Sequence, residues 1–314
     1  MMRFIKARSF ISRYGIYLAF LILCAVIAVM SPPFLRSGNL LNILRQTSIN
    51  GIVAVGMTFV IITGGIDLSV GSMVALAAVL AASFAHTGQY PLVVPILAGL
   101  MAGGLCGLTN GVLIAKRRLA PFIVTLGMMT AARGLALVYT DGRPVIDLSK
   151  EYTSIGGGYL LGIPVPVLIF LLIVVAGMFI LKFTKFGRQV YATGSNEQAA
   201  RISGVQTKQK IIAVYVIAGL LSGLTGIILS SRIMAGSPVA GTGYELDAIA
   251  AVVIGGTSLK GGVGSITGTV TGVLIIGVMN NGLDLMGVSS YWQQIVKAGI
   301  IIMAALLDRK SHSE

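Results

Sequence analysis

Charged side chains are scarce in this chain of 314 residues. Asp, Glu, Lys and Arg together make up 11% of it, whereas a soluble globular domain carries about 25%. Apolar residues make up 55%, and the mean hydropathy is +0.92. So few charges cannot cover a protein of this size with groups that face water. The composition therefore excludes an ordinary soluble protein and a disordered one, and it predicts that lipid surrounds most of the surface.

Cysteine and histidine are also scarce, with two of each. Cys24 and Cys106 both lie inside apolar runs, which argues against a disulfide framework. His86 and His312 have neither a carboxylate pair nor metal-ligand spacing around them. We therefore expect no catalytic residue and no metal site in this chain.

The segment 255–262 reads GGTSLKGG and looks at first like a phosphate-binding loop. That motif requires a lysine at the position where Gly262 stands, so the match fails. We therefore expect this chain to bind no cofactor. If it transports a solute actively, the energy must come from a gradient or from another subunit that uses ATP.

Long apolar runs fill most of the chain. A helix that crosses a bilayer needs about 20 residues, and 41 glycines suit close helix contacts and broken helices. The predicted fold class is all-α: one transmembrane domain over 1–314, a polytopic membrane protein with about ten helices, several of them broken at Gly-rich turns. The amphipathic residues 36–46 are expected at the outer interface. The expected spans are 14–30, 47–63, 71–85, 91–115, 120–139, 164–182, 211–231, 246–258, 264–282 and 292–307.

The distribution of Lys and Arg predicts the orientation. Arg3, Lys6, Arg8 and Arg13 precede the first run and favour a cytoplasmic N-terminus. Ten spans threaded from there put most of the 23 Lys and Arg residues on the cytoplasmic side, together with both chain ends. Of the two long loops, 140–163 is then outside and 183–210 is inside.

Two glycine-rich segments resemble each other. Residues 60–72 read VIITGGIDLSVGS and residues 252–265 read VVIGGTSLKGGVGS. Internal duplication is common in transporters, and glycine-interrupted segments at matching positions point to the transport path. On the predicted topology both segments turn at the same side of the membrane. The alternative is a chance match in a glycine-rich chain.

Several charges are expected inside or beside the spans, where they are costly and often functional. Asp67, Ser69 and Ser72, beside Gly64 and Gly65, offer weak hydrogen-bonding groups of the kind that a transport path needs. The alternative is that Asp67 caps the following helix and only stabilises the fold. The other candidates are Arg133, Glu245, Asp247, Asp284 and Lys297, for which a structural role is also open.

Three segments carry a resemblance to a known family. Residues 56–72 (GMTFVIITGGIDLSVGS) and 240–262 (AGTGYELDAIAAVVIGGTSLKGG) resemble signatures of the ribose-type sugar permeases of bacterial ABC importers. Residues 280–302 are most similar to the ribose branch. The resemblance implies a ten-span permease in the bacterial inner membrane, working as a homodimer or with a sister permease. It also implies a cytoplasmic ATPase subunit and a periplasmic sugar-binding protein as partners.

The loop 183–210 is similar to the cytoplasmic coupling segment of this family. A short helix with small residues could seat in a groove of the ATPase, and glycines would stop it at both ends. Where the family signature reads Glu-Ala-Ala, this chain reads Glu-Gln-Ala-Ala. The alternative is a solvated loop. The candidate coupling residues are Gly194, Asn196, Glu197, Ala199, Ala200 and Gly204.

On the outer side, the loop 140–163 and residues 237–247 mix charges with Gly and Pro. We expect Arg143, Glu245 and Asp247 to help dock the binding protein. The resemblance thus implies the permease subunit of an ABC importer for a monosaccharide, with ATP hydrolysed by a separate subunit. Ribose is the favoured sugar, and allose, xylose, arabinose and galactofuranose stay open because their permeases share the first two motifs. The alternatives are an ion-coupled secondary sugar transporter, a channel and a membrane enzyme, although the last would need a titratable cluster.

Overall fold

The computed structural model describes the backbone of residues 2–311 and the side chains of residues 15–299 and 302. The side chains of Arg3, Lys6, Arg8 and Arg13, which favour the predicted orientation, lie outside the described set, as do those of Arg309, Lys310 and His312.

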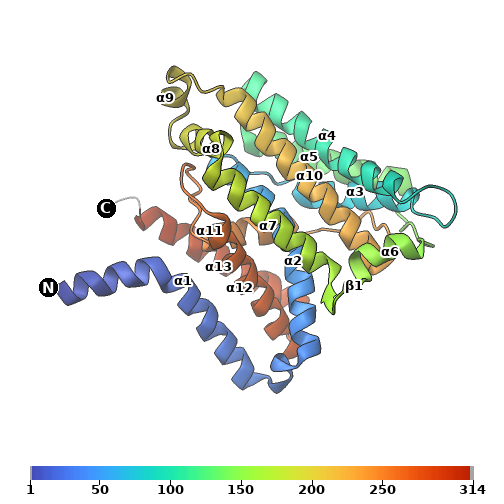
Figure 1. Ribbon diagram of the computed structural model, residues 1–314, viewed down its shortest axis with the longest axis horizontal. Coiled ribbons are helices and arrows are strands. Elements are labelled where there is room, and N and C mark those ends of the chain that lie inside the picture. Colours follow the sequence, from blue (N-terminus) through green and yellow to red (C-terminus); the bar gives the residue numbers. More distant parts are fainter. Residues whose placement is uncertain (1, 312–314) are drawn as a thin grey trace.

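The described chain folds mostly into helices (Figure 1). A 3₁₀ turn, η1 (Pro32–Leu35), and a small hairpin of β1 (Tyr159–Leu160) and β2 (Ile163–Pro164) complete it. The helices are α1 (Met2–Met30), α2 (Ser37–Ile62), α3 (Val70–Ser83), α4 (Val93–Arg117), α5 (Pro121–Thr140), α6 (Lys150–Gly157), α7 (Val165–Phe183), α8 (Lys185–Ser195), α9 (Glu197–Ile202), α10 (Thr207–Ile233), α11 (Tyr244–Ile254), α12 (Ile266–Leu285) and α13 (Ser290–Ser311).

Within the described residues, six helices are long and apolar enough to cross a membrane: α2, α4, α5, α7, α10 and α12. The apolar part of α1, Gly15–Met30, and α3 are shorter. The chain is therefore a polytopic helical membrane protein, as its composition predicts.

Helix α10 lies at the centre and packs against α2, α3 and α4. Gly103 and Gly107 of α4 face Gly219 and Gly223 of α10 so closely that a Cβ added to Gly103 would overlap the α10 backbone. Small residues allow such close approach between membrane helices. Part of the glycine content of the sequence thus serves this contact.

Residues 36–46, expected at the outer interface, are continuous with the next expected span. They are the first turns of α2, which continues without a break to Ile62. One polar side chain among them finds a partner on another helix: Asn39 and Asn281 exchange two hydrogen bonds of 3.0 and 2.8 Å. Ile43 is buried in the same region.

The bundle has two ends of different character. At one, here called the glycine-loop end, the loops 63–69 and 255–265 meet: the Gly262 amide donates to the Ile62 carbonyl at 2.8 Å. Helices α8 and α9 lie at this end, and α6 and the hairpin lie at the opposite one, the hairpin end (Figure 1). The two similar glycine segments therefore turn at the same end, as the sequence predicts.

Candidate functional site

Helices α3 and α11 are half-helices whose N-termini meet inside the protein. They contain 14 and 11 residues, which gives about 21 and 17 Å against about 30 Å of hydrocarbon. Asp247 in the first turn of α11 accepts a hydrogen bond from Asn50, near the middle of α2, at 3.4 Å. Gly71 in the first turn of α3 lies so close to the Glu245 carboxylate and the Gly241 carbonyl that no Cβ would fit.

This meeting point, here called the interior junction, has a distinct electrostatic character. The N-terminus of a helix carries a partial charge of about +0.5, and α11 places Glu245 and Asp247 in its first turn, where carboxylates offset that charge. From the junction α3 runs to the hairpin end and α11 to the glycine-loop end. Paired half-helix ends at mid-depth are the usual substrate sites of transporters built on broken helices.

Arg133 holds the segment that leads into the junction. Its Nη1 donates to the carbonyls of Pro238 and Ala240 at 2.8 and 2.9 Å. Gly236 contacts the C-terminal half of α3 and Gly241 contacts its first turn, so the segment between α10 and α11 descends along α3. The hydrogen bonds of Arg133 to these backbone carbonyls fit the structural role that the sequence left open.

Asp67 is fully buried just before α3. Its Oδ1 accepts from the Ser69 amide at 2.9 Å and from the Ser69 hydroxyl, to which Asn110 donates at 3.0 Å. Ser72 is also buried, and Asp67 Oδ2 has no hydrogen-bond partner among the described residues. The carboxylate thus closes a turn before the helix instead of capping its first amides. Asn110, on α4, could not be assigned to this cluster from sequence.

The two glycines before Asp67 have separate uses. Gly64 adopts φ +79°, which an L side chain rarely adopts. A Cβ at Gly65 would press on the Tyr215 hydroxyl, which donates to the Ile66 carbonyl at 3.5 Å. Both glycines therefore shape the 63–69 loop.

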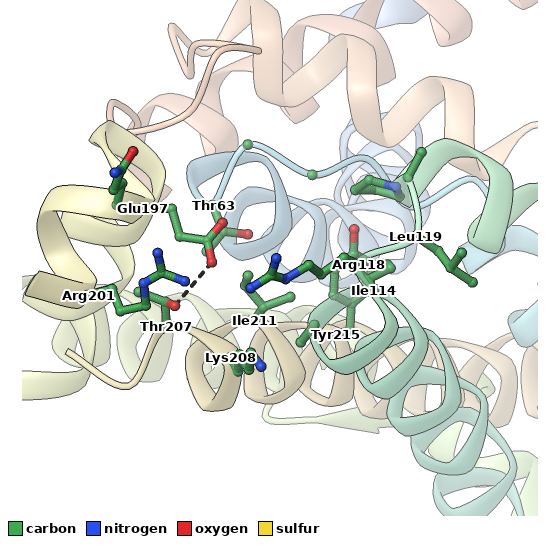
Figure 2. A pocket seen from close by; sticks show the side chains of 16 residues that line it. Thr63, Ile114, Arg118, Leu119, Glu197, Arg201, Thr207, Lys208, Ile211 and Tyr215 are labelled. Carbon is green, nitrogen blue, oxygen red and sulfur yellow. Dashed lines mark hydrogen bonds between the residues drawn. The ribbon is translucent and has the colours of Figure 1, made fainter.

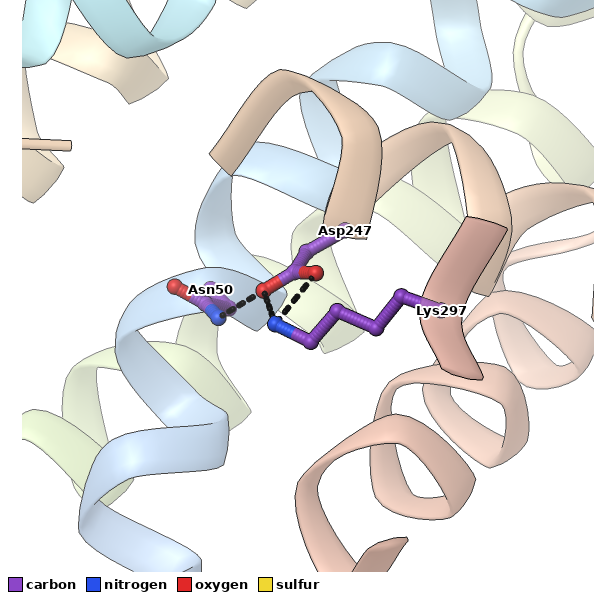
Figure 3. Close-up of polar contacts among 3 residues, drawn as sticks. All are labelled: Asn50, Asp247 and Lys297. Carbon is purple, nitrogen blue, oxygen red and sulfur yellow. Dashed lines mark hydrogen bonds and ion pairs between the residues drawn. The ribbon is translucent and has the colours of Figure 1, made fainter. Parts of the chain in front are cut away.

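Asp247 is buried and forms an ion pair with Lys297 of α13 at 2.9 Å (Figure 3). With Asn50 this pair joins α2, α11 and α13 at the interior junction. A side chain held in this way is withdrawn from the surface, so Asp247 is removed from the expected docking residues. Glu245 is half-buried beside Gly71, and Arg143 is exposed at the hairpin end.

Helix α8 rests directly on both glycine loops. A Cβ at Gly194 would overlap the Ile62 carbonyl and the Gly262 amide. The Tyr191 hydroxyl donates to the Gly264 carbonyl at 2.7 Å, and burial raises the pKa of Tyr191, which keeps the phenol protonated. Gly194 lies within α8, one residue before its end, and permits a close contact, while its part in ATPase coupling stays a prediction. The sequence does not reveal this role of Tyr191, because nothing in the local pattern predicts a partner as distant along the chain as Gly264.

Helix α9 is short and exposed. Asn196 adopts an extended conformation between α8 and α9, and its side chain accepts from the Ala199 amide at 2.9 Å. Glu197 accepts from Thr207 at 3.1 Å, and Ala200 is buried. Gly204 follows the helix at φ +84°, as the predicted C-terminal stop requires. Ala199 is exposed, and Ile202 is 79% exposed, so α9 presents an apolar face outward.

A cavity of about 590 Å³ lies at the glycine-loop end. Its walls come from the 63–65 loop, the end of α4, the connection to α5, α9 and the first turns of α10 (Figure 2). It is separate from the interior junction. Three of the predicted residues, Gly64, Gly65 and Glu197, line this cavity. The others lie at or beside the interior junction, on α8 and α9, and at the hairpin end.

Residues 39–305 match the family described as "Branched-chain amino acid transport system / permease component". The ribose import permease protein of Bacillus subtilis is 51% identical over 300 residues, which cover 95% of this chain and 93% of that protein. The D-allose transport system permease protein of Escherichia coli is 38% identical over 301 residues, 96% of this chain and 92% of the relative. The L-arabinose ABC transporter permease protein of Azospirillum brasilense is 39% identical over 299 residues, which cover 95% of this chain and 88% of that protein. No solved structure matches the chain.

Proposed function

Because the chain belongs to the family of the branched-chain amino acid transport system permease component, we propose that it is the membrane-spanning permease of a bacterial ABC importer for ribose. The observation that carries this proposal is the 51% identity to a ribose import permease, against 38% and 39% to permeases named for allose and arabinose. The likeness extends over nearly the whole of both chains. An ion-coupled secondary transporter is not favoured, because these relatives are import permeases and one is named as an ABC subunit.

The glycine-loop end faces the cytoplasm in this proposal, and both chain ends lie on that side of the inner membrane. Cations gather at that end, as the positive-inside rule requires. The ten membrane helices are then the six long ones together with α1, α3, α11 and α13. Cysteine labelling at Gln198 and Arg143 tests the orientation, because both side chains are exposed and lie at opposite ends. The cations at this end include Lys116, Arg117, Arg118, Lys182, Lys185, Arg188, Arg201, Lys208, Lys210 and Lys260.

Coupling to ATP hydrolysis runs through α8 and α9 in this proposal. The exposed face of α9 seats in the ATPase subunit, which uses the ATP, while this chain binds no cofactor. Movement of α9 passes to α8, whose contacts at Gly194 and Tyr191 reach both glycine loops. Two permease copies pair in the membrane, so that each supplies one coupling helix.

The sugar passes beside the interior junction. The ends of α3 and α11 that meet there, with the polar groups beside them, offer weak hydrogen-bonding partners to sugar hydroxyls, which suits a site that must also release its ligand. Asp67 and Ser69 set the turn that starts α3. At the hairpin end, Arg143 and the neighbouring loop meet the periplasmic binding protein.

Complementation tests the proposed substrate. The chain is expressed in a bacterium that lacks its own ribose permease and keeps the ATPase and binding protein. Ribose uptake should return, while allose and arabinose uptake should not. Restoration of allose or arabinose uptake alone would assign a different sugar.

A further inference from the structure

The cavity at the glycine-loop end is lined by three cations from three different elements. Arg118 directly follows α4, Arg201 belongs to α9 and Lys208 to the first turn of α10. Figure 2 shows the Arg118 and Arg201 side chains reaching into the same space from opposite walls. Arg118 adopts φ +55°, a left-handed conformation that an arginine rarely takes.

These cations have no anionic partner in the described part of the chain. Neither Arg118, Arg201 nor Lys208 forms an ion pair or a side-chain hydrogen bond there. The only carboxylate in the wall is Glu197, which already accepts a hydrogen bond from Thr207 at 3.1 Å. The cavity therefore carries a net positive charge with guanidinium groups free to bind.

The volume and the chemistry together define a ligand class. About 590 Å³ lies within the range of small-molecule sites, which is about 300–1,000 Å³. Guanidinium groups bind phosphate through paired, charge-assisted hydrogen bonds. Thr63 and Tyr215 add hydroxyls to the wall for a polar remainder. We propose that this cavity binds a small phosphate-bearing ligand, either a free phosphorylated metabolite or a lipid headgroup.

Such a ligand has a defined mechanical consequence. It connects α9 with the end of α4 and with the 63–65 loop, which leads to Asp67 and α3. A ligand that ties these elements together restrains α9 relative to the loop that it is proposed to move. Occupancy should therefore slow coupling, and this regulatory consequence rests on the proposed function. Binding itself does not depend on the identity of the sugar.

Binding is measured on the full chain in lipid nanodiscs, without partner subunits, using inorganic pyrophosphate and a sugar monophosphate as probes. Arg118→Gln and Arg201→Gln should each weaken binding about tenfold or more, while Arg118→Lys should restore part of it. Arg117→Gln and Arg188→Gln remove exposed cations at the same end that do not line the cavity, so binding should stay unchanged.

Nanodiscs of zwitterionic lipid alone and nanodiscs that include phosphatidylglycerol separate the two sources of phosphate. If phosphatidylglycerol competes with the probe, and Arg118→Gln abolishes that competition, the ligand is a lipid headgroup. If the probe binds equally well in both kinds of nanodisc, the ligand is a free metabolite. Either result supports the proposal. Absence of probe and lipid binding, or equal weakening by the two control variants, overturns it. If neither binds but Arg118→Gln and Arg201→Gln release the ATPase subunit, the cavity instead receives an acidic segment of that protein and the proposal is wrong.

Discussion

Gly194 of α8 lies against the carbonyl of Ile62, the last residue of α2, so closely that the smallest side chain would not fit between them. The Gly262 amide donates to the same carbonyl at 2.8 Å. One atom of α2 is therefore the meeting point of α8 and both glycine loops. Any motion of α8 must displace these loops or break this contact.

Gly194→Ala should uncouple the permease while leaving it in the membrane. The added methyl group pushes α8 away from the loops, and such overpacking costs about 1–3 kcal/mol of unfolding free energy. Gly127→Ala is the matched control, since a Cβ there meets open space. Thermal unfolding and ATP-driven uptake should both fall for Gly194→Ala and stay unchanged for Gly127→Ala. Normal uptake by Gly194→Ala would remove α8 from the coupling path.

Tyr191→Phe removes the hydrogen bond to Gly264 without changing the packing of the ring. The free energy of unfolding should fall by about 0.5–1.5 kcal/mol. Because burial raises the pKa of Tyr191, the stabilising contribution is present below the ordinary tyrosine value of about 10 and is lost as the pH rises through the raised pKa. The unfolding free energies of wild type and variant, measured with denaturant, should therefore differ by a constant amount up to about pH 10. A difference that disappears near neutral pH would contradict this assignment.

Asp247→Asn should strongly destabilise the protein, because it leaves the Lys297 ammonium without its counter-charge. Breaking a buried pair from one side costs roughly 3–5 kcal/mol, and the partial exposure of Lys297, 23%, puts the expectation at the lower end. The double variant Asp247→Asn with Lys297→Met should regain part of the loss in a double-mutant cycle. If the double variant is no better than the single one, the two charges do not interact as described.

Asp67→Asn should insert, assemble and transport nearly as wild type. The amide oxygen of Asn can accept from the Ser69 amide as Oδ1 of Asp67 does, whereas Asp67→Leu loses that acceptor and should unfold more readily. Uptake rates and detergent stability of the two variants separate the roles. Slow uptake by a fully stable Asp67→Asn would place the carboxylate in the sugar path.

The sequence predicts the class of fold well because hydrophobic length and charge bias are local properties. It places the two glycine turns at one end for the same reason. It fails where a residue is defined by a distant partner: Asp247 looks like a docking residue until Lys297, 50 positions later, is seen to neutralise it. Gly194 looks like a helix stop until Ile62 is seen against it. Arg118, Arg201 and Lys208 look like ordinary cytoplasmic cations until the fold brings them to one cavity.

Reconstitution tests the central claim most directly. The chain is placed in liposomes with the ATPase subunit and a ribose-binding protein, and labelled ribose is followed with and without ATP. The account predicts that ribose moves against its gradient only with ATP, and that Gly194→Ala abolishes this accumulation while Gly127→Ala does not. Ribose accumulation that follows an imposed ion gradient without ATP, or simple equilibration across the membrane, would contradict it.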